Sequence, residues 1–528
     1  MTWNLARSRE RIEKLKGTVP ASLIDVKMFD DTFLREKRIH MADKGLRSGV
    51  GGDPIFSVSP NEAVVTDAVH VYVQLIDYHE AVQGVGRETE AGHRRLLQFM
   101  HLHYSATDSV VEQYEAQRVD YHGPRLHAVV PTPAGGIMEH DRVVKALAMA
   151  STLKAVIEGA GDSFGQPGLR TRVRIGIDTG KAVAINSGRG SEPEPLFLGN
   201  PANYAAKLAE GDQPGIFVSD RVRAVLGQKA AGSMMMERAS AVTMQDQSAY
   251  LHQNNRSPYG FYDARLPDQI VQTTFSKMRA NDSLRATLTS EAVFQFHQHT
   301  PPLKTIDFKE LMPSNSIRMN MVSIFADIDG FTAYVDNAIR TGQVRQMVAN
   351  LHVIRGELAN VLKSDFDGRK VRFIGDCVHG IVAEGTRTDT DDRGSVTTGV
   401  LCAGGLRSSF ELCRRMLPGI SQLGLAIGLE LGPTPVTRLG IRGERSVRCA
   451  ASKAVSVSEI LQSECDGNQT AIGDRALSIA SNRVSQLFPD GVADGLDYET
   501  ADQTIGSGLS TPAIVVSQAQ PEFRAHSR

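Results

Sequence analysis

Residues Ser323–Thr332 read SIFADIDGFT, and the fold and function of the chain both depend on this short stretch. Its first residues are typical of a buried strand, yet the strand ends in Asp327 and Asp329, one residue apart, followed by Gly330. Aspartate before glycine at a strand end is also common turn chemistry. A further acidic residue, later in the chain, favours a functional interpretation.

Asp376 is that further residue, and it lies in RKVRFIGDCVHGIV, residues 369–382. Apolar residues on both sides of the Gly-Asp pair predict two antiparallel strands joined by a tight turn. Neighbouring strands can bring Asp376 and Asp327 close together, and two adjacent carboxylates repel each other unless a cation lies between them. The pair therefore predicts a site for Mg²⁺ or Mn²⁺, with the backbone carbonyl of Ile328 as a further ligand.

The helix that follows the first strand is expected to begin at Gly330, Phe331 and Thr332. Backbone N–H groups in the first turn of a helix have no partner within the helix, so they can hold phosphate oxygens. The stretch therefore predicts a phosphate site beside the metal site.

The chain also contains an internal repeat. The segment VDYHGPRLHAVV (119–130) aligns without gaps with VRFIGDCVHGIV (371–382), and the preceding strands and the later helices align at nearly the same offset. Several matches in the same order indicate a duplicated domain. Each copy reads β-α-β-β-α-β, which is a ferredoxin-like α+β arrangement.

These patterns predict five segments. We expect a helical leader over 1–62, a first domain over 63–230, a linker over 231–312, a second domain over 313–485, and a C-terminal extension over 486–528 with a disordered polar tail. The two domains are called the first and the second repeat below. A ferredoxin-like layout hosts many functions, so function has to be argued from the sites.

The two quoted motifs together resemble the catalytic domain of the class III nucleotide cyclases, the adenylate and guanylate cyclase family. The resemblance covers about 65–230 and 315–480 and is weaker in the first repeat. It implies that the repeats pair within one chain as a pseudo-heterodimer, with the active site at their interface. One partner then supplies two metal aspartates, matched here by Asp327 and Asp376, for two Mn²⁺ or Mg²⁺ ions.

In this family the other partner supplies an asparagine that orients the ribose and an arginine that stabilises the transition state. The helix LGNPANYAAKLAE (198–210) of the first repeat is similar to the family's motif, with Asn203 at the asparagine position and Lys207 where the family has arginine. Lysine is a point charge without the arginine fork, so arginine-like geometry is not implied.

The two repeats lack complementary parts. The first has Gln74 and Pro124 at the positions of the metal aspartates, and the second has Ser456 and Ile460 at the positions of Asn203 and Lys207. Neither repeat is complete, but together they supply one full set. We therefore expect one working site and one degenerate site, which predicts an enzyme.

The base is expected to be read by the first repeat. Where adenylate cyclases have lysine and guanylate cyclases glutamate, this chain has Asp120, and a second selective position, aspartate in adenylate cyclases, holds Leu196. Neither purine pattern is met. Asp120 can accept from an N–H donor such as uracil N3–H or the cytosine amino group, and Tyr121 can pack on a ring.

Such departures look like the pyrimidine cyclases of bacterial Pycsar antiphage systems. That resemblance implies a second messenger, cyclic UMP in preference to cyclic CMP, Mn²⁺ as the preferred ion, and a separate effector protein on which the product acts. Cyclic GMP is a competing product, because guanine also offers N–H donors to a carboxylate, and cyclic AMP is a further purine alternative. A catalytically inactive nucleotide sensor derived from a cyclase is the alternative of another class.

The composition of the chain indicates which kinds of binding partner and which cellular compartment to expect. Lys and Arg number 58 and Asp and Glu 60, and this balance does not favour nucleic acid or an anionic membrane as a partner. There is no transmembrane-length apolar run and no apolar stretch of a signal peptide near the start. The five cysteines have no metal or disulfide spacing, which favours a cytoplasmic protein. A homodimer of the chain is left open.

Overall fold

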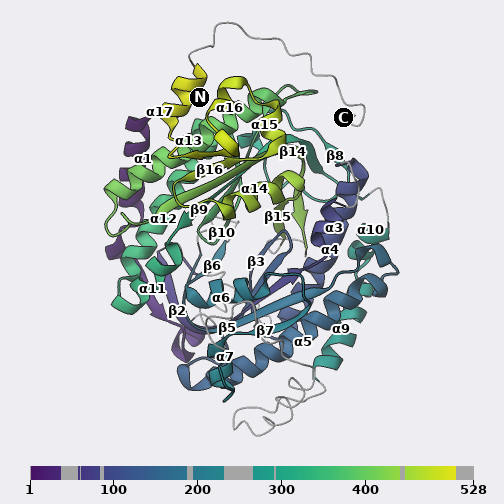
Figure 1. Ribbon diagram of the computed structural model, residues 1–528. Coiled ribbons are helices and arrows are strands. Elements are labelled where there is room, and N and C mark those ends of the chain that lie inside the picture. The colour runs from purple at the N-terminus through teal and green to yellow at the C-terminus, as the bar shows by residue number, and fades with distance from the viewer. Residues whose placement is uncertain are drawn as a thin grey trace.

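The computed structural model describes residues 2–36, 58–59, 61–83, 88–186, 194–230, 266–289, 293–440 and 446–506. It contains two large mixed sheets, one from each part of the chain, with helices packed around them (Figure 1). The α+β class predicted from the sequence is confirmed. The exact domain boundaries stay a prediction.

The sheet of the first repeat runs in the order β3-β4-β2-β5-β6, with β1 on β2 and β7 on β5. Its strands are β1 (Asp25–Met28), β2 (Glu62–Leu75), β3 (Gln117–His122), β4 (Arg125–Val130), β5 (Val173–Asn186), β6 (Pro195–Leu198) and β7 (Gly215–Val218). Its helices are α3 (Tyr78–Gln83), α4 (Glu90–Gln113), α5 (Glu139–Ser163), α6 (Asn200–Ala209) and α7 (Asp220–Val225).

The sheet of the second repeat runs in the order β10-β11-β9-β14-β16-β17, with β15 on β14 and β8 on β9. Its strands are β8 (Phe296–His297), β9 (Ser316–Asp329), β10 (Arg369–Ile374), β11 (Cys377–Val382), β14 (Gly424–Leu439), β15 (Val447–Ala450), β16 (Gln469–Ile472) and β17 (Val492–Asp494), beside a small ribbon of β12 (Glu384–Gly385) and β13 (Thr390–Asp391). Its helices are α11 (Phe331–Thr341), α12 (Val344–Asn360), α13 (Asp392–Met416), α14 (Lys453–Glu464), α15 (Asp474–Ile479), α16 (Asn482–Gln486) and α17 (Tyr498–Gly506).

Strand register confirms the predicted alignment of the repeats. Val73 of β2 pairs with Leu126 of β4, and the equivalent Ala326 of β9 pairs with Val378 of β11. The central strands β2 and β5 match β9 and β14 in the same way. Since side chains alternate along a strand, equal register places Gln74 and Asp327 on the same relative face of their sheets.

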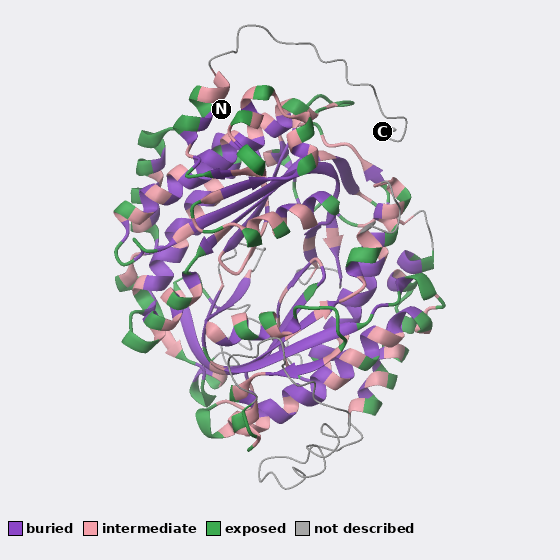
Figure 2. Cartoon of the chain, viewed as in Figure 1, coloured by how far each residue is buried: buried purple, intermediate pink, exposed green. Residues whose placement is uncertain are grey.

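Burial explains why these strands form the centre of each repeat. Val69, Val71 and Val73 of β2 are buried in a core shared with α4 and α5. The corresponding positions of β9 are buried in a second core, which includes residues of α12 and α13. Figure 2 shows the buried residues concentrated on the strands and on the adjoining helix faces. The opposite face of β9 carries Phe325 and Asp327, and that of β2 carries Tyr72 and Gln74.

The leader contains a helix, as predicted, and also a strand that the sequence did not indicate. Its helix α1 (Leu5–Thr18) packs on α12 and α13 of the second repeat, whereas β1 pairs in parallel with β2 of the first. The four-residue strand β1 lacks the apolar alternation that would mark it in the sequence. The leader therefore joins both repeats.

The predicted linker contains helices α9 (Leu266–Ala280) and α10 (Asp282–Thr289), which pack on α4, with α9 also on α5. The rest of it up to residue 265, and the tail from residue 507, lie outside the described residues.

Buried charges hold α1 in place. The Arg11 guanidinium donates to Glu357 at 2.6 and 3.0 Å and to Asp365 at 2.8 and 2.9 Å. Both carboxylate side chains are fully buried. Ser8 also donates to Glu357, at 2.7 Å, and Arg7 contacts Asp365 from the surface.

Replacing Arg11 by Met is expected to destabilise the protein by about 3 kcal/mol, because two buried carboxylates would lose their main cation. Thermal unfolding should show a drop of several degrees. Arg9→Met is the matched control, since Arg9 is exposed on the same helix, and it should leave the transition within about 1 °C, given that exposed charges contribute little. Equal transitions for both variants would contradict this role of Arg11.

Candidate functional site

An acidic pair lies where β9 ends beside the β10–β11 turn. Antiparallel pairing of β9 with β11 brings Asp327 next to the turn that holds Asp376. Burial, followed by the charge of Asp329, raises the pKa of Asp327 to about 6. Burial, followed by the charge of Asp327, raises the pKa of Asp376 well above its ordinary value. The structure thus brings the two predicted aspartates together, and their negative charges repel each other.

The backbone next to this pair turns sharply into α11. Gly330 has φ 79° and ψ 2°, the left-handed region in which a side chain is strained. Phe331 buries its ring in the core of the second repeat, so only its backbone can face a ligand. The side chain of Ile328 is buried in the same core, and again only its backbone is available. Thr332 is partly exposed at the helix start.

Helix α6 of the first repeat meets α11 of the second at this point. Asn203 donates from its side-chain amide to the Thr332 hydroxyl at 3.2 Å, and the Asn200 N–H donates to Asp336 at 2.9 Å. Lys207 lies one turn beyond Asn203 on α6 and is exposed. Residues separated by four positions share one helix face. The predicted amide from one repeat therefore contacts the predicted phosphate site of the other.

The equivalent face, where the β3–β4 hairpin of the first repeat meets α14 of the second, is filled by side chains. Tyr78, at the position equivalent to Phe331, is 2% exposed, and Tyr104 donates from its hydroxyl to the carbonyl of Gly123 at 2.9 Å. Glu459 of α14 lies 3.2 Å from both His122 and Arg125 of the first repeat. Ion pairs and packed rings occupy the face that the sequence predicts to be degenerate.

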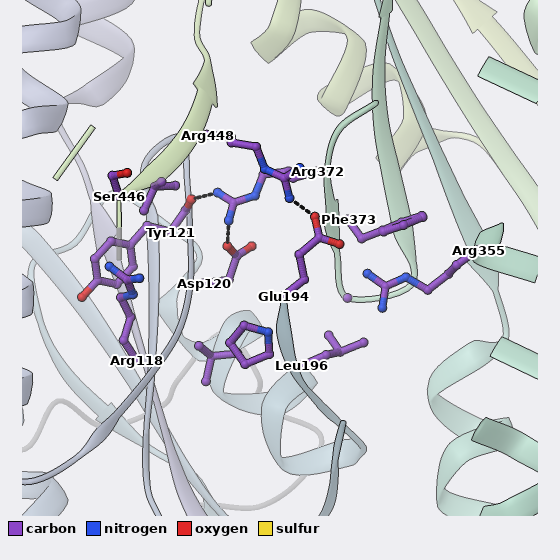
Figure 3. A pocket seen from close by; sticks show the side chains of 14 residues that line it. Arg118, Asp120, Tyr121, Glu194, Leu196, Arg355, Arg372, Phe373, Ser446 and Arg448 are labelled. Carbon is purple, nitrogen blue, oxygen red and sulfur yellow. Dashed lines mark hydrogen bonds and ion pairs between the residues drawn. The ribbon is translucent and has the colours of Figure 1, made fainter. Parts of the chain in front are cut away.

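The positions expected to read the base line a small cavity between the repeats (Figure 3). Asp120 forms an ion pair with Arg372 of the second repeat, which also donates to the carbonyl of Tyr121. Leu196 of β6 lies in the same wall and is buried.

The ring of Tyr121 is not placed as predicted. It is fully buried, its hydroxyl donates to Asp108 at 3.0 Å, and the Arg118 guanidinium lies 5.3 Å from the ring centre. The ring therefore packs within the first repeat rather than on a base. Successive side chains of a strand point to opposite faces, so Tyr121 and Asp120 cannot face the same ligand. Its carbonyl is the part that reaches the cavity.

Several charged residues of this cavity were missed by sequence reasoning. Glu194 bonds to Lys370 at 2.9 and 3.0 Å and to Arg448, while Arg355 of α12 lies in the same wall. The partners of Glu194 come from the other repeat, and no local pattern in the sequence links them. These residues could have been found only by expecting that β6 and the β10–β11 hairpin both lie at the interface between the repeats.

Within the described ranges, no group of three or more His, Cys, Asp or Glu side chains gathers as a metal site would. The acidic pair would supply two carboxylates, and backbone, substrate or water oxygens would complete any coordination. Among the same residues, no helix has the length and hydropathy that a membrane span requires.

Comparisons with known proteins agree with this geometry. The profile of the adenylate and guanylate cyclase catalytic domain matches residues 85–252. That match lies mainly in the first repeat, although the motifs led us to expect the weaker resemblance there. A curated uridylate cyclase from a Rhizobium species is 49% identical, over 98% of this chain and 97% of its own.

A second curated uridylate cyclase, from Pseudomonas aeruginosa, is 38% identical over 89% of this chain and 88% of its own. A solved structure described as a class III adenylyl cyclase-like ATP-binding protein from Pseudomonas aeruginosa superposes with a TM-score of 0.82 at 36% identity. It covers 96% of this chain and 100% of that chain. The chain therefore belongs to the class III nucleotide cyclase family.

Proposed function

We propose that the chain cyclises UTP to 3′,5′-cyclic UMP and pyrophosphate at the single face where Asn203 meets Thr332. That contact is the observation that carries the proposal, because it joins the ribose-side helix α6 to the phosphate-side helix α11 next to the acidic pair. The names of the two curated relatives support uracil as the base.

The acidic pair fits a divalent cation. Burial raises the pKa of both carboxyl groups, with the charge of Asp329 adding to the shift of Asp327 and the charge of Asp327 adding to the shift of Asp376. A bound Mn²⁺ or Mg²⁺ would offset these negative charges. The two carboxylates and the Ile328 carbonyl offer oxygen ligands, which these hard ions prefer. We propose that Asp327, Asp376 and the carbonyl of Ile328 hold two such ions. When bound, they would lower the pKa of the ribose 3′-hydroxyl and neutralise charge on the α-phosphate.

The chain's own residues then have distinct tasks. The 3′-oxygen attacks the α-phosphorus, the bond to the β-phosphate oxygen breaks, and pyrophosphate leaves. Asn203 orients the ribose, and Lys207 faces the charge that develops on the phosphate oxygens. The N–H groups of the turn at Gly330, Phe331 and Thr332 hold the phosphates.

Base recognition is assigned to Asp120 and Leu196, with the carbonyl of Tyr121 beside them. We further propose that cyclic UMP serves as a messenger of antiphage defence and acts on a separate effector in the cytoplasm. This biological role rests on the resemblance to Pycsar cyclases alone.

Replacing Asp327 by Asn is expected to stabilise the protein in a chelator. The folded-state pKa of about 6 lies above the ordinary 3.8, so above pH 6 the ionised carboxylate destabilises the fold, on the order of 2 kcal/mol. Thermal unfolding at pH 8 should rise by a few degrees, and the gain should disappear near pH 4. Gln74→Asn, at the equivalent position, is the control.

Saturating Mn²⁺ should reverse this order, because only the wild type keeps both carboxylates. A variant less stable than the wild type at pH 8 in chelator would count against the repulsive pair.

Replacing Lys207 by Ala is expected to lower kcat by about 10²–10³-fold, since a donor aimed at developing charge contributes about 3–4 kcal/mol. Ile460→Ala, at the equivalent and also exposed position of α14, should leave kcat within twofold. Lys207→Arg should recover part of the loss. Steady-state kinetics with UTP provide the measurement, and comparable effects of the two alanine variants would refute one-sided catalysis.

Substrate choice is tested by incubating the purified chain separately with each of the four ribonucleoside triphosphates and Mn²⁺. Mass spectrometry is expected to find cyclic UMP and pyrophosphate as the main products, and EDTA should stop the reaction. Turnover of a purine triphosphate alone would overturn the pyrimidine assignment. Nucleotide binding without release of pyrophosphate would instead favour an inactive sensor.

A further inference from the structure

Helix α6, which carries the proposed ribose and transition-state residues, begins without a cap of its own. The residue before the helix, Gly199, has φ 132° and no side chain, so it cannot cap the helix itself. The second residue of the helix, Pro201, has no N–H group. The N–H of the first residue, Asn200, donates to Asp336 Oδ1 of α11 at 2.9 Å. The second repeat thus supplies the cap that the sequence before α6 lacks.

A second bond joins the same two helices, since Asn203 donates from its side chain to the Thr332 hydroxyl at 3.2 Å. On α11, the two acceptors Thr332 and Asp336 are four residues apart. On α6, the two donors Asn200 and Asn203 are three residues apart, so each pair lies along one face of its helix. Two bonds at separate points fix both the position of α6 along α11 and its rotation, whereas a single bond would leave the rotation free.

Asp336 also interacts electrostatically with Arg221 of α7. Burial raises the pKa of Asp336, whereas the Asn200 N–H and the charge of Arg221 act in the opposite direction. Arg221 is itself bonded to the buried Asp178 of β5, to which its Nε donates at 3.0 Å. Two elements of the first repeat, the start of α6 and the helix α7, thus favour a carboxylate at Asp336.

The degenerate face contains a contact of the same kind. Lys453, at the position of α14 equivalent to Asn200, donates its backbone N–H to Glu88 Oε1 at 2.9 Å. Here too, a carboxylate of one repeat accepts from the first residue of a helix of the other. Helix α14 also has a cap of its own, because the Ser452 hydroxyl accepts from the Val455 N–H at 3.2 Å. Of these two helices, α6 is therefore the one that relies on the opposite repeat for its cap.

On the basis of the proposed function, we propose that Asp336 is a positioning residue for the reaction. By capping α6 from the second repeat, it holds Asn203 against Thr332 and sets the direction in which Lys207 extends. Lys207 is exposed, so its position depends on the helix that carries it. A displacement of about 1 Å can lower a rate about 10²-fold, so loss of this cap affects turnover although Asp336 is assigned no contact with the nucleotide.

The first test measures kcat and KM for UTP in Asp336→Ala. We expect kcat to fall by about 10- to 100-fold and KM to change by less than about threefold, because the misplaced residues act mainly on the transition state. An unchanged kcat, or a loss seen only in KM, would overturn the proposal.

Asp336→Asn is the conservative variant. Its amide oxygen can still accept from the Asn200 N–H, and asparagine caps helices about as well as aspartate, so kcat is expected to stay within about threefold of the wild type. A loss as large as that expected for Asp336→Ala would contradict a role as a cap.

If Asp336→Ala does not fold, Asn200→Pro removes the same bond from the other helix. Proline has no N–H and is favoured at the first position of a helix, so α6 itself is preserved. The expected loss of kcat is again about 10- to 100-fold. Wild-type turnover in this variant would overturn the proposal.

Glu88→Ala is the matched control at the degenerate face. Glu88 also contacts Arg475 at 3.4 Å, so its loss should lower the unfolding temperature. Helix α14 carries no residue of the proposed site and keeps its own cap, so kcat should stay within about twofold of the wild type. A loss of kcat equal to that of Asp336→Ala would mean that general loosening of the two repeats lowers activity, and it would overturn the assignment to Asp336.

Hydrogen exchange of the full chain, followed by mass spectrometry of peptides, tests the cap without turnover. Asp336→Ala should speed exchange at the start of α6 by about fivefold, whereas Asp336→Asn should leave it unchanged. Unchanged exchange in the alanine variant would overturn the cap even if the wild type is active. A wild type that makes no cyclic UMP would instead contradict the proposed function, and the exchange result would still decide whether Asp336 caps α6.

Discussion

The contact between helices α6 and α11 is the constraint on which the site depends. It is made by side chains and backbone groups from two repeats that are far apart in the sequence, with Asn203 on Thr332 and Asn200 on Asp336. Without it, the acidic pair would remain a repulsive feature at the end of a strand. Through this contact, Asn203 of the first repeat meets the first turn of α11, which directly follows the strand that contains Asp327.

Because the domain is duplicated, the two repeats form two equivalent faces, and only one of them is needed for the proposed site. Where the second copy of a site would form, Tyr78 and Tyr104 fill the space and Glu459 bonds with His122 and Arg125. These contacts need buried rings and paired charges, which are incompatible with an open nucleotide cleft. At this face the two repeats are held together by side-chain packing and ion pairs.

Local patterns in the sequence were sufficient for the fold and indicated the residues that we propose form the centre of the site. Hairpin and strand offsets gave the correct register, and the motifs around Asp327, Asp376 and Asn203 identified residues that the structure brings together. Pattern reasoning was wrong for Tyr121, because strand alternation turns its ring away from Asp120. It missed Glu194, because its partners Lys370 and Arg448 lie more than 150 residues away in the sequence. Charge networks between repeats have no local signature.

The covalent connection between the repeats has a kinetic consequence. A site assembled from two separate chains loses its partner on dilution, so its specific activity falls with concentration. Here the linker helices α9 and α10 pack on the first repeat. The leader contributes strand β1 to the sheet of the first repeat, and its helix α1 packs on the second repeat. Each half thus finds its partner at an effective concentration set by the tether rather than by the abundance of the protein. All residues of the proposed site belong to one chain, so its specific activity is expected to stay constant on dilution.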